Sequence, residues 1–169
     1  MSRSGFRLFV LLGLLALLAG CDLRLRDTTL AEMDAAEAAW QQHPIPDYHI
    51  VVEVQRPDEL RRIDIRVQQG EVISAVLLQW DAQQRVWRPP YDLPPAHSFP
   101  FTVPGLFDTV RGALAHSGRT RIAVQMAGDP AFPQRIEFGP VWEEGQMVQG
   151  TEASIRVREF EALSDPTEN

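Results

Sequence analysis

Apolar and polar residues alternate along much of this chain, a pattern typical of strands with one buried face. Short turn-forming segments, among them Gln69-Gly70, separate the first three of these strands, which predicts an antiparallel meander. The third segment, 72–80, is apolar on both faces, so we expect it to be central in a sheet or covered by a helix. The segments with strand periodicity are 47–55, 62–68, 72–80, 119–127, 134–138 and 152–160.

Two other segments show helical periodicity. Apolar residues recur every three or four positions over 28–42, where Thr29 and Glu32 match a capping box. A second helix is expected over 102–117, with Gly118 as its stop. The order α-βββ-α-βββ predicts the α+β class, with two helices packed on a mainly antiparallel sheet of about six strands.

Residues 81–101 show no clear period and are rich in proline. Loops of this length are uncommon and tend to be functional. Aromatic side chains on a backbone stiffened by proline are suited to contact a partner, although they could instead fold back to cover the sheet. The candidate binding residues are Trp87, Tyr91, His97, Phe99 and Phe101.

The N-terminus has the features of a signal peptide. Arg3 and Arg7 flank the start of an apolar stretch at 8–18, which is shorter than the roughly 20 residues that a transmembrane helix needs. The small residues that follow, and the single cysteine Cys21, resemble a bacterial lipoprotein signal. We therefore predict that residues 1–20 are removed. An ordinary secretory signal with a chance cysteine is the alternative.

Lipidation at Cys21 would attach the protein to a membrane. A diacylglycerol and a further acyl chain such as palmitate anchor a protein stably, whereas one chain does not. Asp22 resembles a signal for retention, which predicts the periplasmic side of the inner membrane, with the outer membrane as the alternative. A lipidated tether at 21–27 would hold the domain within about 20 Å of the bilayer.

Composition limits the possible classes of function. The formal net charge of −7 makes the chain a poor nucleic-acid binder, because that affinity depends on neutralising phosphates. All sixteen basic residues are arginine, which excludes chemistry that needs a lysine, such as a Schiff base or a P-loop. The length after the tether fits one domain at 28–163 and a polar tail at 164–169.

Residues that support catalysis or metal binding form no recognisable motif. The four histidines lack the spacing of a zinc site. Ser98 and Ser117 each follow a histidine, but no Gly-x-Ser-x-Gly elbow is present. The carboxylates Glu143 and Glu144 are more typical of a solvated surface than of a glycosidase site. We predict no catalytic residue, no metal and no cofactor.

Short landmarks are spread over roughly residues 36–163. They are Trp40, Tyr48-x-Ile50, Val67-x-x-Gly70-x-Val72, Thr102-Val103-x-x-Leu106-Phe107, Asp129-x-x-x-Pro133-x-x-Ile136 and Gly150-Thr151-Glu152. Together they resemble a family of small bacterial lipoproteins with a domain of unknown function, which implies no established activity. A cysteine pair that such proteins often carry on the first hairpin is missing here, and their aspartate pair before the last strand is reduced to Glu152.

The sequence thus favours a non-enzymatic, membrane-anchored lipoprotein that acts through a protein partner in the envelope or in envelope maintenance. A periplasmic binder of a ligand or peptide, using residues 85–101, is one alternative, and an envelope hydrolase is another. A protein partner predicts cross-linking in membranes, and a ligand predicts a shift in melting temperature. A hydrolase predicts loss of the phenotype when His97 or Ser98 is substituted.

Overall fold

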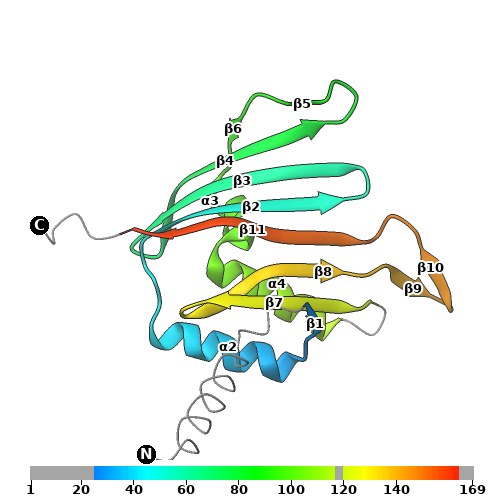
Figure 1. Ribbon diagram of the computed structural model, residues 1–169, viewed down its shortest axis with the longest axis horizontal. Coiled ribbons are helices and arrows are strands. Elements are labelled where there is room, and N and C mark those ends of the chain that lie inside the picture. The colour runs from blue at the N-terminus through cyan, green and yellow to red at the C-terminus, as the bar shows by residue number, and fades with distance from the viewer. Residues whose placement is uncertain (1–24, 117–119, 164–169) are drawn as a thin grey trace, which may run out of the picture.

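One twisted antiparallel sheet forms the centre of the computed structural model, which describes residues 25–116 and 120–163 (Figure 1). It holds nine strands in the order β1-β7-β8-β11-β2-β3-β4-β5, and β6 also pairs with β4. The strands are β1 (Arg26–Asp27), β2 (Tyr48–Arg56), β3 (Glu59–Gln68), β4 (Glu71–Asp81), β5 (Val86–Trp87), β6 (Tyr91–Asp92), β7 (Ile122–Gly128), β8 (Ala131–Phe138) and β11 (Ala153–Ala162). A separate hairpin consists of β9 (Val141–Glu143) and β10 (Gln146–Val148).

Helices lie on one face of this sheet. α2 (Leu30–Gln42) and α4 (Val103–Ala115) contact each other, and both pack against β8. The short α3 (Pro95–Ser98) lies against β4, and the 3-10 turn η1 (Phe99–Phe101) lies against α4. Apolar residues of α2 and α4 form a single core with the alternate apolar residues of the strands. The largest side chains that are fully buried in this core include Met33, Ile50, Ile63, Leu106, Phe107, Phe132 and Ile136.

The sheet has more strands than the sequence predicts, and the short α3 is a helix beyond the two expected. The two long helices and the mainly antiparallel pairing agree with the expectation. Three of the additional strands, β1, β5 and β6, are two residues long, too short to leave a side-chain period. The β9–β10 hairpin is also absent from the sequence prediction. The apolar strand β4 lies near the edge of the sheet and not at its centre, with β5, β6 and α3 against it.

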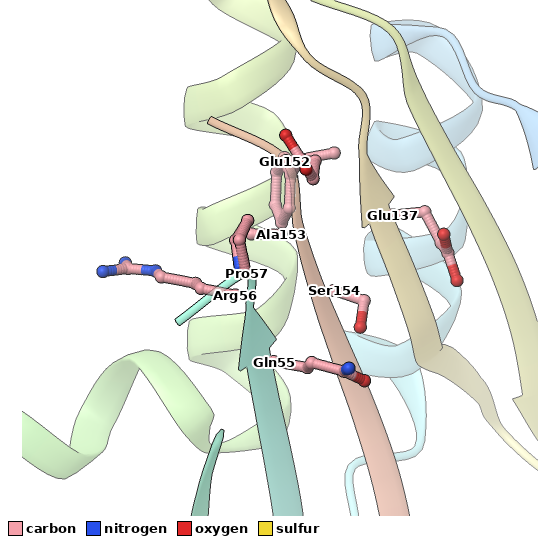
Figure 2. Close-up of a pocket in the computed structure, with 8 residues that line it drawn as sticks. Gln55, Arg56, Pro57, Glu137, Glu152, Ala153 and Ser154 are labelled. Carbon is pink, nitrogen blue, oxygen red and sulfur yellow. The ribbon is translucent and has the colours of Figure 1, made fainter. Parts of the chain in front are cut away.

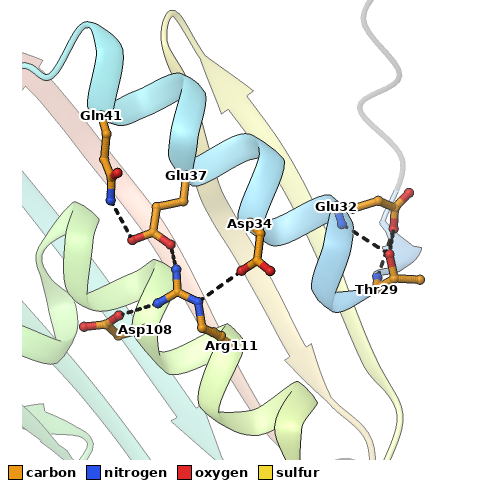
Figure 3. Close-up of polar contacts among 7 residues, drawn as sticks. All are labelled: Thr29, Glu32, Asp34, Glu37, Gln41, Asp108 and Arg111. Atoms are coloured by element: carbon orange, nitrogen blue, oxygen red, sulfur yellow. Dashed lines mark hydrogen bonds and ion pairs between the residues drawn. The ribbon is translucent and has the colours of Figure 1, made fainter.

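The N-terminus of α2 has the capping box that its sequence predicts (Figure 3). The Thr29 hydroxyl accepts a hydrogen bond from the Glu32 amide at 3.3 Å, and the Glu32 carboxylate accepts one from the Thr29 amide at 2.9 Å. Two amides that the helix itself leaves unpaired are thereby satisfied. This is why the helix begins at Leu30.

Arg111 on α4 links the two helices (Figure 3). Its guanidinium forms ion pairs with Asp34 at 3.2 Å and with Glu37, both on α2, and with Asp108 at 3.0 Å within α4. Ion pairs between partly solvated side chains contribute little free energy. The packing of α2 and α4 therefore depends mainly on their apolar residues, and Arg111 adds ion pairs between them.

The proline-rich segment runs back along the outer edge of β4. Trp87 pairs with Trp80, and Tyr91 pairs with Leu77, both in antiparallel register. These short strands cover backbone groups that an edge strand would otherwise present to other chains. Residues 81–101, for which the sequence shows no clear period, are thus ordered as two short strands, one helical turn and a 3-10 turn.

The first residues that the structure describes attach to the opposite edge of the sheet. Arg26 and Asp27 pair with Val124 and Ala123 of β7, and the Asp27 carboxylate accepts a hydrogen bond from the Arg121 Nε at 2.5 Å. The signal peptide, Cys21, Asp22 and the polar tail predicted from the sequence lie outside the described residues. Across residues 25–116 and 120–163, no helix is both long and apolar enough to cross a membrane.

Tyr48 connects the first long strand to the start of α4. Its hydroxyl accepts a hydrogen bond from the Val103 amide at 3.2 Å, and burial raises the pKa of Tyr48. We expect Tyr48→Phe to lower the free energy of unfolding by about 1–2 kcal/mol, because it leaves a buried amide without an acceptor. Urea denaturation measures the loss. Tyr91→Phe is the control, since Tyr91 is exposed, and equal stability of the two variants would contradict this role.

Candidate functional site: the uncovered face of the sheet

The face of the sheet opposite α2 and α4 has a row of arginines across four neighbouring strands. Arg135 on β8 lies opposite Arg156 on β11, which lies opposite Glu53 on β2, which in turn lies opposite Arg62 on β3. Arg158, at a bulge in β11, contacts Glu53 from the same side. We call Arg62, Arg135, Arg156 and Arg158 the arginine row, with Glu53 at its centre.

Glu53 is the only buried charged residue among the residues that the structure describes, with 8% of its surface exposed. One carboxylate oxygen, Oε2, accepts a hydrogen bond from Arg62 at 3.3 Å, and the other, Oε1, accepts one from Arg158. Burial alone would raise the pKa of Glu53, but the hydrogen bonds and charges of the two arginines outweigh it, so the pKa lies below its usual value. Glu53 therefore stays ionised and fixes both guanidinium groups.

This lowered pKa predicts a contribution to stability that depends on pH. Because the folded-state pKa lies below the unfolded one, the contribution is present above the ordinary glutamate pKa of about 4.3 and is lost as the pH falls through the folded-state pKa. We expect Glu53→Gln to cost about 1–2 kcal/mol at pH 7, since Arg62 and Arg158 stay partly solvated. Well below pH 4 its unfolding free energy should approach that of the wild type.

Chemical denaturation at pH 7 and at pH 3 measures this difference. Glu71→Gln is the matched control, because Glu71 is exposed at the end of β4 and its carboxylate has no hydrogen bond or ion pair among the described residues. A cost for Glu53→Gln that is the same at both pH values would show that its ionised form is not what the arginines stabilise.

Two tryptophans lie at the β3–β4 end of the arginine row. The Arg62 Cζ atom lies 4.9 Å from the centroid of the Trp87 ring, and the Trp87 and Trp80 rings meet edge to face at 5.4 Å. A guanidinium over an aromatic face makes a cation–π contact. Of the sequence-predicted binding residues, Trp87 is thus the one placed on the uncovered face, and Trp80 joins it although the sequence did not single it out.

The other candidate binding residues are dispersed. Tyr91 and Phe99 are exposed, His97 is exposed at the end of α3, and Phe101 packs partly into the core. Within the described residues, no ring contact joins any two of the five candidates. The structure therefore does not gather them into one aromatic cluster, and a binding role for each stays a prediction.

Ser98 lies deep in the structure. Its side chain has no exposed surface, and its hydroxyl donates a hydrogen bond to the Pro95 carbonyl at 2.9 Å. This is the hydrogen bond of a helical turn and leaves the oxygen without access to a substrate. Among residues 25–116 and 120–163, no three histidine, cysteine or acidic side chains are grouped so that they could hold a metal ion.

A shallow pocket of about 300 Å³ adjoins the arginine row (Figure 2). Gln55, Ser154 and Glu137 lie in register across β2, β11 and β8. Each is two residues from the member of the row Glu53, Arg156 and Arg135 on its own strand, toward the same end of the sheet. Figure 2 shows these polar side chains on three neighbouring strands, with Glu152 at the end of the pocket. The pocket extends the polar surface of the uncovered face.

Residues 32–162 match a family of unknown function, DUF6174, and the chain belongs to this family. The match begins in α2 and ends with β11, so it contains the arginine row and every strand of the sheet except β1. The resemblance to a family with a domain of unknown function is thereby confirmed, while the lipoprotein part of that expectation stays a prediction. Comparison with curated proteins and with solved structures gives no match.

The signal for this site in the sequence is weak. The alternation of strands 47–55 and 62–68 indicates that Glu53 and Arg62 point away from the core. Nothing in the local pattern shows that β11 lies between β2 and β8, which is what brings Arg156 and Arg135 beside them. The row depends on pairing between strands that are about a hundred residues apart.

Proposed function

We propose that this protein is a non-enzymatic, membrane-anchored module that binds a protein partner of the cell envelope through the uncovered face of its sheet. The observation that carries the proposal is the contact of Arg62 with both Glu53 and Trp87 on a face that no described helix covers. Arginine and tryptophan are enriched among the residues that contribute most to protein interfaces. Here both are held in place before a partner arrives, which lowers the entropy cost of binding.

The chemistry of this face favours binding over catalysis. A general acid or base works best when its pKa lies near the working pH, and the pKa of Glu53 lies below even the usual glutamate value. Both of its oxygens are occupied by arginines. Ser98, the nucleophile that the hydrolase alternative would use, is buried. These features support an interaction surface.

Anchoring through Cys21 on the periplasmic side of the inner membrane completes the proposal. The pairing of β1 with β7 supports a short link, because the chain joins the sheet at Arg26, only five residues beyond Cys21. Such a link spans at most about 18 Å. The β7 edge would then lie near the bilayer, and Trp87, on the far edge, would lie roughly 30 Å further out, at about 4.8 Å per strand.

Photo-cross-linking in cells tests this function. A photoreactive amino acid replaces Ser74, which is exposed on β4 and lies opposite Arg66 on the uncovered face. We expect it to form an adduct with one protein of defined mass, and we expect the same residue at Gln42, exposed at the end of α2, to form none. Equal adducts from both positions, or an adduct from Gln42 alone, would contradict the proposal. With Cys21→Ser, the Ser74 adduct should fall sharply if the anchor is needed.

A further inference from the structure

The arginine row places two like charges opposite each other. Arg135 and Arg156 lie directly opposite each other in the β8–β11 register, an arrangement that destabilises a sheet. The charge of Arg135 is balanced by Glu137, whose Oε1 accepts hydrogen bonds from the Arg135 Nη2 at 2.5 Å and Nε at 2.8 Å. Among the described residues, Arg156 has no such partner on that side.

The carboxylate on the other side of Arg156 is already occupied. Glu53 lies directly opposite Arg156 in the β11–β2 register, but its two oxygens bind Arg62 and Arg158. Within the part of the chain that the structure describes, Arg156 is thus the one guanidinium of the arginine row without a hydrogen bond or ion pair to a carboxylate. It is half-buried, so water compensates its charge only in part.

We propose that Arg156 binds a side-chain carboxylate of an acidic segment in the partner protein. This inference rests on the proposed function and adds the chemistry of the partner. A guanidinium binds a carboxylate through two parallel hydrogen bonds, which gives both energy and orientation. Arg135 and Arg158 add positive potential on either side, and a bound carboxylate would relieve the repulsion between Arg135 and Arg156.

The surroundings of the row favour a protein over an anionic bilayer. Asp64, Glu159 and Glu161 lie on the same face and would be repelled by a negatively charged membrane surface. Trp87 and Trp80 give the face an apolar area that matches a protein interface. Positive charge on this face is concentrated in the arginine row, in a chain whose net charge is −7. An acidic segment with apolar neighbours complements this distribution.

Peptide binding tests the inference directly. The full chain in neutral detergent micelles is titrated into a fluorescein-labelled acidic peptide of alternating glutamate and serine, and the anisotropy is recorded. Arg156→Gln should weaken binding roughly tenfold, the loss of one charge-assisted pair. Arg66→Gln should change it less than about twofold, because Arg66 is exposed on the same face outside the arginine row and also lacks an ion pair among the described residues.

Two further measurements distinguish a lost carboxylate contact from a change in folding or in charge alone. Arg156→Gln should unfold at no lower temperature than the wild type, because it removes a like-charge contact, so weaker binding cannot be assigned to misfolding. Arg156→Lys should recover only part of the affinity, since an ammonium cannot make the two parallel hydrogen bonds. Equal weakening by Arg156→Gln and Arg66→Gln, or no saturable binding at millimolar peptide, would overturn the inference.

A vesicle experiment distinguishes a protein carboxylate from an anionic lipid as the ligand of Arg156. Vesicles of phosphatidylglycerol are mixed with the Cys21→Ser chain and floated. Suppose that the vesicles bind the chain with Arg156 but not the Arg156→Gln variant, and that the acidic peptide binds neither. This result would overturn the inference in favour of a lipid surface. If peptide binding fails while the Ser74 adduct still forms, the acidic partner is wrong and the proposed function stands. If the Ser74 adduct also fails to form, the proposed function falls with it.

Discussion

Gly105→Ala should lower the free energy of unfolding by at least about 3 kcal/mol, the upper end of the cost of overpacking. A Cβ atom at Gly105 would lie 1.9 Å from the Phe99 carbonyl oxygen and 2.8 Å from the Pro100 Cα. Both are backbone atoms of η1, so no side chain can rotate to make room. The same carbonyl accepts hydrogen bonds from the amide and the hydroxyl of Thr102, and any shift of η1 would strain both.

Gly112 in the same helix is the matched control for this prediction. A Cβ atom at Gly112 would meet nothing within 4 Å. Gly112→Ala should therefore stabilise the protein by up to about 1 kcal/mol through helix propensity alone. Urea denaturation of the two variants should show changes of opposite sign. Changes of the same sign and similar size would mean that the backbone of η1 does not lie against Gly105 in the first turn of α4.

Phe132→Ala should cost about 3–5 kcal/mol, the range for removing a buried aromatic side chain. Phe132 on β8 is 1% exposed, and its ring centroid lies 4.7 Å from that of Phe160 on β11 and 5.6 Å from that of Trp40 on α2. The ring therefore joins α2 to two central strands. Its loss would leave a cavity between them.

Trp142 provides the contrast for Phe132. It is 52% exposed on the β9–β10 hairpin, which forms a sheet of its own in the part of the chain that the structure describes. Trp142→Ala should change the free energy of unfolding by no more than about 0.5 kcal/mol. Thermal unfolding followed by circular dichroism compares the two variants. If Phe132→Ala stays within about 1 kcal/mol of the wild type, the three rings do not form the centre of the core.

The elements that sequence could predict are those with strong local signals. The capping box at Thr29 marks the start of α2, and Gln69-Gly70, both with positive φ, forms the tight turn expected between β3 and β4. Glu144-Gly145 has the same positive-φ conformation and joins β9 to β10. Both turns have the same sequence signal, an acidic or amide residue followed by glycine. The signal at Glu144-Gly145 therefore predicts the β9–β10 hairpin, which the sequence prediction did not include.

The remaining elements depend on contacts between distant segments. β5 and β6 are held by the backbone of β4, so residues 81–101 leave no period in the side chains. The arginine row requires the order β8-β11-β2-β3, which follows from the pairing of the last strand between the two halves of the chain. The sequence prediction placed binding in residues 85–101, and of its candidates only Trp87 contacts the row, through Arg62.

The uncovered face is the surface that we propose binds an envelope protein. Its central group is Arg62, fixed between the carboxylate of Glu53 and the ring of Trp87. Residues of this type near the centre of an interface often contribute 2 kcal/mol or more, on the order of a thirtyfold change in affinity. Substituting Trp87 should therefore weaken the complex far more than substituting an exposed tryptophan elsewhere.

The most direct measurement is the yield of the Ser74 photo-adduct in living cells, compared among the wild type, Trp87→Ala and Trp142→Ala at equal protein levels. Both substitutions remove a tryptophan, but only Trp87 lies on the uncovered face beside the arginine row. We predict that Trp87→Ala removes most of the adduct and that Trp142→Ala leaves it unchanged. An adduct that persists in Trp87→Ala, or is lost equally in both, would contradict binding through this face.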